Sequence, residues 1–137
     1  MATTPAAAPA KEKAKKKKNT KIASGILYVK TTENNTIVTL TDEKGNKISG
    51  SGTGSAGFKG AKENTPYAAE MLTKNVMKEA RDERGLKQVG IVFRGAGMGR
   101  DGVFKAINDL GLIDILWIKE ETALQHGGTK GYRPKRM

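Results

Sequence analysis

Residues 88–118 read QVGIVFRGAGMGRDGVFKAINDLGLIDILWI, and this stretch decides the fold class. Gln88 to Phe93 is typical of a buried strand, and Leu112 to Ile118 predicts a last apolar strand. The residues between them predict a short helix that ends at Gly111, because apolar side chains recur at helical spacing: Val103, Phe104, Ile107 and Leu110. A strand, a helix and a parallel strand joined by a right-handed crossover make a βαβ unit, so the stretch predicts an α/β domain. Strands that alternate with helices in this way are expected to be buried.

The part of the chain before this unit predicts three more strands. Ile26 to Lys30 alternates, Asn34-Asn35 interrupts the run, and residues 36–41 continue as a β-branched, alternating strand. A second turn leads to a short third strand at 47–49. The predicted element order is β-β-β-α-β-α-β, with a mixed five-stranded sheet. From Ser49 to Gly60 we expect irregular chain, because no regular element should tolerate glycine at 50, 52, 54, 57 and 60.

A longer helix is predicted between these two parts. Thr65 suits the N-cap, Pro66 suits the first helical position, and Gly85 suits the residue after the last turn. The core-facing residues follow at helical spacing: Ala69, Leu72, Val76 and Ala80.

The charge of +11 on 137 residues is concentrated at the two ends of the chain. Residues 1–21 carry a balance of +6 and residues 126–137 a balance of +4, whereas residues 22–125 are nearly neutral. We therefore expect a disordered Ala/Pro/Lys-rich arm over 1–21, a single domain over 22–125 and a basic tail over 126–137. Such cationic segments cannot fold alone and suit a polyanion, above all a nucleic acid.

Several classes of protein are excluded by composition. Without cysteine there are no disulfides and no thiolate metal sites, and one histidine does not support a histidine triad or a metal cluster. No apolar run approaches the roughly 18 to 20 residues of a membrane span. The acidic residues fall at helical surfaces and turns and do not converge on strand ends, which argues against a metal-dependent nuclease. We expect no enzyme, no metal and no cofactor.

The glycine loop after Phe93 allows three interpretations. Residues 97–102 (GMGRDG) match a dinucleotide-binding pattern, with Glu120 about 20 residues further on. The same loop, flanked by Arg94 and Arg100, suits an RNA phosphate held by glycine N–H groups, with Gly97 in a positive-φ conformation. It is also compatible with a plain turn between a strand and a helix. Whether the loop holds a phosphate or is a plain turn, we expect the Arg100 side chain to make few apolar contacts. A similar pattern at 52–57 lies too far from the helix start at Pro66 to hold a phosphate.

Three separated blocks resemble the bacterial small-ribosomal-subunit protein eleven family, known as the universal S-eleven family. They are residues 34–42 (NNTIVTLTD), residues 57–60 (GFKG) leading to 65–69 (TPYAA), and the loop 94–100. The resemblance extends from Ile26 to Arg136 and implies a ribonuclease H-like α/β fold without nuclease carboxylates. Ala96 and Met98 stand where the family loop usually has prolines, and the C-terminal residues differ from the family pattern.

The resemblance also implies a function and a location. It implies a structural, RNA-binding protein of the cytoplasmic ribosome that bridges ribosomal RNA helices on the platform of the small subunit. The implied surroundings are the Shine-Dalgarno cleft, the messenger RNA exit, small-subunit proteins seven and eighteen, and initiation factor three. An architectural DNA-binding protein remains the alternative, because a lysine-rich Ala/Pro arm also suits that role.

The residues that we expect to contact RNA are basic, glycine-loop, hairpin-tip and stacking residues in five segments. In chain order they are Lys15, Lys16, Lys17, Lys18, Lys21, Asn34, Asn35, Gly57, Phe58, Lys59, Lys62, Arg94, Gly97, Gly99, Arg100, His126, Lys130, Tyr132, Arg133, Lys135 and Arg136.

Overall fold

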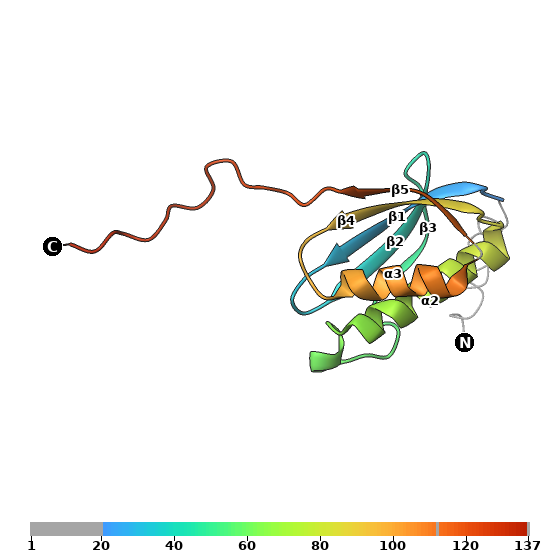
Figure 1. Ribbon diagram of the computed structural model, residues 1–137, viewed down its shortest axis with the longest axis horizontal. Helices are drawn as coiled ribbons and strands as arrows, with labels where there is room; N and C mark the ends of the chain where they lie inside the picture. The colour runs from blue at the N-terminus through green and yellow to red at the C-terminus, as the bar shows by residue number, and fades with distance from the viewer. Residues whose placement is uncertain (1–20, 112, 137) are drawn as a thin grey trace, which may run out of the picture.

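The computed structural model describes residues 21–111 and 113–136, so Lys15 to Lys18 lie outside the described residues. Its elements follow the predicted order (Figure 1): β1 (Ser24–Thr31), β2 (Thr36–Asp42), β3 (Lys47–Gly52), the short 3-10 helix η1 (Gly60–Lys62), α2 (Pro66–Arg84), β4 (Gln88–Arg94), α3 (Gly99–Leu110) and β5 (Asp114–Glu120). The strands form one sheet in the order β3-β2-β1-β4-β5. β1 is antiparallel to β2 and parallel to β4, and β4 is parallel to β5, which confirms the predicted mixed α/β sheet.

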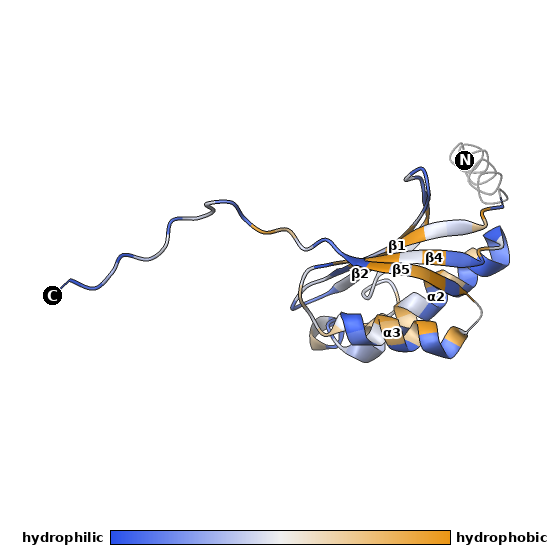
Figure 2. Ribbon diagram, turned by 45° about the horizontal axis from the view of Figure 1, so that its top comes forward, coloured by the Kyte–Doolittle hydropathy of each residue, from blue (hydrophilic) through white to orange (hydrophobic). Residues whose placement is uncertain are grey.

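Both helices cover the same face of the sheet (Figures 1 and 2). Residues of β1 alternate accordingly: Leu27 and Val29 are buried under the helices, whereas Tyr28 and Lys30 point to the uncovered face. The core lies between that covered face and the apolar stripes of the helices. It includes Leu27, Val29, Val38, Leu40, Leu72, Val76, Met77, Val89, Ile91, Phe93, Val103 and Ile107.

The ends of α2 are set by the residues that the sequence indicated. Thr65 Oγ1 accepts a hydrogen bond from the Ala68 N–H at 3.3 Å, and Pro66 begins the helix. Gly85 is left-handed, with a φ of 67°, and its N–H donates to the Arg81 carbonyl at 3.0 Å. Gly111 ends α3 in the same way, with a φ of 56°.

Two expectations about the strands were wrong. The glycine-rich chain from Ser49 is not irregular from its start, because β3 continues to Gly52. Its glycines sit where the backbones approach closely: a Cβ at Gly50 would lie 2.7 Å from the Val38 carbonyl oxygen. The last apolar strand is not buried, since β5 is the edge strand of the sheet and all seven of its residues are exposed.

Candidate nucleic-acid interface

Four segments meet at one end of the sheet, which we call the loop edge. The parallel strands β1, β4 and β5 all end there. The loop edge consists of the turn 32–35, the loop 53–65, the loop 95–98 and the root of the tail at 121–123. Lys21 lies at the opposite end, where the Ile22 N–H donates to the Arg84 carbonyl at 2.9 Å. Lys21 and the tail root therefore lie at opposite ends of the sheet.

Hydrogen bonds join the β1–β2 turn to the loop 53–65. The Thr53 N–H donates to the Thr36 carbonyl at 3.1 Å, and Asn64 Nδ2 donates to the Glu33 carbonyl at 2.6 Å. Asn35 Oδ1 accepts from the Thr36 N–H at 2.7 Å and from the buried Thr53 hydroxyl. Of the two predicted contact residues in the turn, Asn35 thus shapes the loop edge, whereas Asn34 is exposed.

The loop 95–98 is tied to β1 and to the tail. The Thr31 hydroxyl donates to the Gly95 carbonyl at 3.1 Å, and the Gly95 N–H donates to Thr122 Oγ1 at 3.2 Å. The tail root is therefore part of the same hydrogen-bonded unit as the loop.

The two arginines that flank this loop are bound within the chain. Arg94 Nη2 donates to Glu121 Oε2 at 3.0 Å, and its guanidinium lies over the Tyr28 ring, 5.5 Å from the centroid. Arg100 Nε donates to the Gly95 carbonyl at 3.0 Å, and Nη2 donates to Glu120 Oε1 at 2.9 Å.

Arg100 also has apolar contact, contrary to the sequence-based expectation. Its guanidinium lies over the Phe93 ring, 5.5 Å from the centroid, and its side chain is 26% exposed. The hydrogen bonds from Arg100 and Arg94 hold the pKa of Glu120 and of Glu121 below the usual range for glutamate. Both carboxylates are therefore charged at neutral pH and neutralise the two arginines locally.

The glycines of this loop are needed for packing against the chain itself. A Cβ at Gly97 would lie 2.8 Å from the Thr32 carbonyl oxygen, and one at Gly99 would collide with Thr36 Oγ1. Gly97 does not adopt a positive φ, so that expectation was wrong; Gly95 does, with a φ of 84°. With Gly99 buried and Glu120 bound to Arg100, the elements of a dinucleotide site are occupied by intramolecular contacts.

The loop 53–65 presents its predicted contact residues to solvent. Gly57, Lys59 and Lys62 are exposed, and neither lysine forms an ion pair with another described residue. Phe58 packs edge-on against Tyr67, with the ring centroids 5.8 Å apart. Tyr67 is 60% exposed in the first turn of α2 and was missed as a candidate. The sequence signal that could have identified Tyr67 is its position directly after the Thr65-Pro66 helix start.

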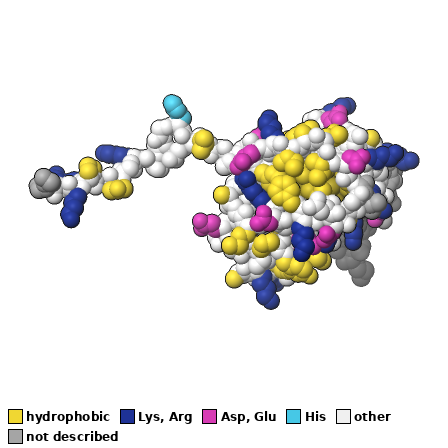
Figure 3. All heavy atoms as spheres, in the orientation of Figure 1, with side chains coloured by type: hydrophobic (Ala, Val, Ile, Leu, Met, Phe, Trp, Pro, Cys, Tyr) yellow, Lys and Arg dark blue, Asp and Glu magenta, His cyan; other side chains and the backbone are white. Residues whose placement is uncertain are grey.

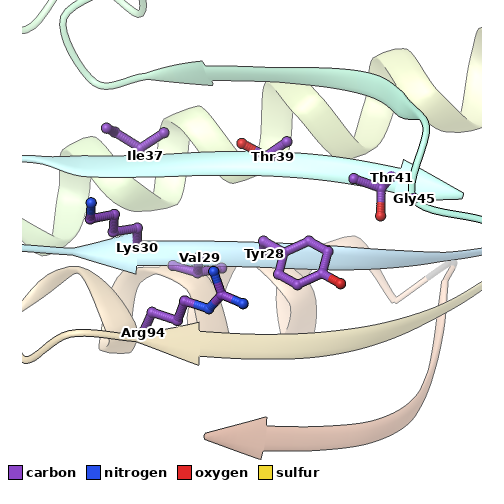
Figure 4. A pocket seen from close by; sticks show the side chains of 8 residues that line it. All are labelled: Tyr28, Val29, Lys30, Ile37, Thr39, Thr41, Gly45 and Arg94. Atoms are coloured by element: carbon purple, nitrogen blue, oxygen red, sulfur yellow. The ribbon is translucent and has the colours of Figure 1, made fainter. Parts of the chain in front are cut away.

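A shallow hollow runs along the uncovered face of the sheet, from Gly45 in the β2–β3 turn to Lys30 and Arg94 next to the loop edge. It measures about 430 Å³, and Figure 4 shows Tyr28 and Lys30 of β1 and Arg94 of β4 among the side chains that line it. Lys30 and Arg94 also line a second hollow of about 560 Å³, which includes Thr122 at the tail root. The two hollows thus lead from the sheet face to the tail, and Lys30 is a cation that the sequence analysis did not select.

The tail extends away from the sheet without helix or strand from residue 121 to residue 136 (Figures 1 and 3). After Glu121 the sequence holds four basic residues and no acidic one. All its predicted contact residues are exposed: His126, Lys130, Tyr132, Arg133, Lys135 and Arg136.

Residues 21–111 and 113–136 contain neither a metal-binding cluster nor a membrane-spanning helix. Within these ranges, no group of three or more His, Asp or Glu side chains could hold a metal ion. No helix in the described ranges is long and apolar enough to cross a membrane.

Known proteins similar to this chain indicate its family. The family described as ribosomal protein S11 matches residues 25–136. A small ribosomal subunit protein uS11 from Campylobacter fetus subsp. fetus (strain 82-40) is 44% identical over 130 residues, which are 93% of this chain and 99% of that protein. The uS11 protein of Helicobacter pylori (strain ATCC 700392 / 26695) is 43% identical over 121 residues, which are 88% of this chain and 90% of that protein. Since the match spans the sheet, both helices and the tail, the chain belongs to the ribosomal protein S11 family.

Proposed function

We propose that this chain holds small-subunit ribosomal RNA at its loop edge and along its tail. Family membership confirms the coarser predictions: a structural protein of the small subunit of the cytoplasmic ribosome, and not an enzyme. The observation that carries the finer proposal is the convergence of three loops and the tail root at one end of the sheet. A rigid edge of this kind can fix the relative positions of RNA segments that would otherwise repel each other.

The cations of the proposed interface fall into two groups with different roles. Lys59, Lys62 and the tail cations are exposed and form no ion pair among the described residues, so they are available to phosphates. Arg100 is bound to Gly95 and Glu120 and organises the loop. Arg94, whose side chain is 55% exposed, can exchange Glu121 for a phosphate at the cost of one surface ion pair.

Exposed aromatic side chains supply contacts of another kind. Tyr132 on the tail is 95% exposed, and Tyr67 lies beside Phe58 at the loop edge. Unpaired RNA bases stack on such rings, so these tyrosines and His126 are proposed as base contacts. Asn34 is proposed as a polar contact at the hairpin tip.

The resemblance to the S-eleven family supplies the proposed surroundings. On that basis we place the chain on the platform of the small subunit, near the Shine-Dalgarno cleft and the messenger RNA exit. Small-subunit proteins seven and eighteen are the proposed neighbours, initiation factor three approaches there, and the tail lies nearest the messenger RNA.

Removal of the tail tests this function. The full chain and a chain that ends at residue 126 are titrated with small-subunit ribosomal RNA at several salt concentrations. If the four tail cations contact phosphates, the slope of log affinity against log salt should flatten by about 0.7 to 0.9 for each, or about 3 in total. An unchanged slope in a folded truncated chain would show that the tail contacts no phosphate.

A further inference from the structure

The edge strand β5 carries an uncovered apolar strip. We define the β5 strip as residues 115–118, with exposed fractions of 38% for Ile115, 53% for Leu116, 41% for Trp117 and 51% for Ile118. Figure 3 shows hydrophobic side chains gathered on the face of the molecule that carries β5 and α3. Soluble proteins seldom expose a contiguous apolar patch of this kind unless another molecule covers it.

The strip is apolar on both faces of the sheet. Ile115 and Ile118 align with Val89 and Ile91, whose side chains are in the core on the helix side. Trp117 aligns with Gly90 and lies over it on the other face, where a Cβ on that glycine would collide with the indole ring. A docked helix would cover only one of these faces, whereas a strand added beside β5 would cover both.

The backbone of β5 is also free to accept a strand. β5 is the last strand of the sheet, and no described segment pairs with its outer side. Proteins usually protect such an edge with charged side chains, yet the four central residues of β5 carry none. The protective features of β5 are the charged residues at its ends, Asp114, Lys119 and Glu120, and a bulge at Leu116, because Val89 pairs with Ile115 and Gly90 with Trp117.

The charges around the strip argue against RNA as the occupant. At the loop-edge end of the strip, three cations are each bound to a carboxylate: Arg94 and Lys119 to Glu121, at 3.0 and 3.2 Å, and Arg100 to Glu120. An RNA phosphate would have to displace a carboxylate to reach any of these three cations. A second copy of this chain is disfavoured too, because antiparallel pairing of two whole β5 strands would place Asp114 opposite Glu120 at both ends.

We propose that β5 binds an extended segment of another protein chain of the ribosomal particle, which adds to the sheet as a sixth strand. The segment is apolar in its middle, where it meets the β5 strip on both faces. It carries Lys or Arg where it passes Asp114, since this exposed carboxylate forms no ion pair with any other described residue. This surface is separate from the RNA contacts proposed above. The inference depends on the proposed function only because it takes the partner protein from the same ribosomal particle.

A photoreactive amino acid at position 116 tests the proposal in the assembled particle. The full chain carrying it is incorporated into small ribosomal subunits, irradiated and analysed by mass spectrometry. A chain with the photoreactive residue at Asn75, which is exposed on α2, is the matched control. We expect a cross-link from position 116, and none from position 75, to a peptide of another protein with an apolar centre and a basic residue.

Amide hydrogen exchange of the unmodified chain provides the second measurement. The amides of residues 115–118 should exchange about tenfold more slowly, or slower still, in the subunit than in the free protein, because the added strand gives exposed groups hydrogen-bond partners. A cross-link to RNA, to a second copy or to residues 1–20 of the same chain would overturn the proposal. The proposal would also fail if no cross-link formed and the amides of residues 115–118 exchanged as fast in the subunit as in the free protein. A chain that does not sediment with small subunits contradicts the proposed function as well, whereas one that sediments with β5 unprotected contradicts this inference alone.

Discussion

The two glycine-rich loops of this protein look alike in sequence and differ in structure. The loop 53–65 holds three glycines and two lysines, and the loop 95–98 holds two glycines and lies between two arginines, Arg94 and Arg100. Around the second loop, the glycines pack against the chain and the arginines are bound to Glu120 and Glu121. In the first loop, Gly57 has open space around it and the lysines are exposed. The comparison shows that one loop is part of the framework and the other is available to a ligand.

The largest expected effect is on the stability of the framework loop. Gly95 and Gly57 both have positive φ, 84° and 98°, but only Gly95 has a neighbour that a Cβ would meet, the Thr31 carbonyl. Gly95→Ala should therefore lower the free energy of unfolding by about 2 to 4 kcal/mol, from backbone strain plus overpacking. Gly57→Ala should cost only the strain, about 1 to 2 kcal/mol. Urea denaturation of both variants measures the difference, and equal losses would contradict the assignment of two roles.

A smaller loss of stability is expected when Arg100 is replaced. Arg100→Ala removes hydrogen bonds to Gly95 and Glu120 and the contact with the Phe93 ring. We expect the free energy of unfolding to fall by about 1 to 2 kcal/mol. Arg100→Lys keeps the charge, but an ammonium cannot donate to Gly95 and Glu120 as the planar guanidinium does. It should therefore recover only part of the lost free energy of unfolding. If Arg100→Ala melted like the wild type, Arg100 would be a free phosphate ligand rather than a framework residue.

Acid should weaken the same loop. Because Arg100 and Arg94 lower the pKa of Glu120 and Glu121 in the folded chain, these contacts stabilise the fold above the unfolded value of 4.5. That contribution is lost as the pH falls from 4.5 through the lower folded pKa values. Urea denaturation at pH 6 and at about pH 3 should therefore show a smaller acid-induced loss in a Glu120→Gln/Glu121→Gln variant than in the wild type. An equal loss in both chains would place the acid sensitivity elsewhere.

The smallest effect is expected from the N-terminal arm. Removal of residues 1–18 leaves all the described elements, and the first described backbone hydrogen bond outside them starts at Ile22. The melting temperature should stay within about 2 °C, as for surface changes of under 0.5 kcal/mol. A loss of cooperative unfolding on calorimetry would show that the arm belongs to the core.

Local signals made most of the fold predictable from sequence. Thr65-Pro66, Gly85 and Gly111 mark helix ends through their own backbone preferences, and alternation marks β1 and β2. The exposure of β5 was not predictable from sequence. An apolar run has the same sequence pattern in a central strand, paired on both sides, as in an edge strand with one side unpaired.

The candidate site was predictable in part. Basic and glycine-rich composition selected loops that the structure brings to one end of the sheet, but the partners of Arg94 and Arg100 are 27 and 20 residues away in sequence. Only the parallel pairing of β4 with β5 brings Glu121 and Glu120 to them. The same long-range pairing assembles the loop edge, so composition alone could not separate framework cations from free ones.

The most direct test of the assignment of a framework loop and a ligand-binding loop compares two pairs of exposed lysines. Lys59→Ala/Lys62→Ala removes the free cations at the loop edge, and Lys44→Ala/Lys47→Ala removes a matched pair at the opposite end of the sheet. With small-subunit ribosomal RNA at one moderate salt concentration, the first variant should bind about tenfold more weakly than the wild type, a change of about 1.4 kcal/mol. The second should bind like the wild type, and both should melt like it. Equal affinities of the two folded variants would contradict the account.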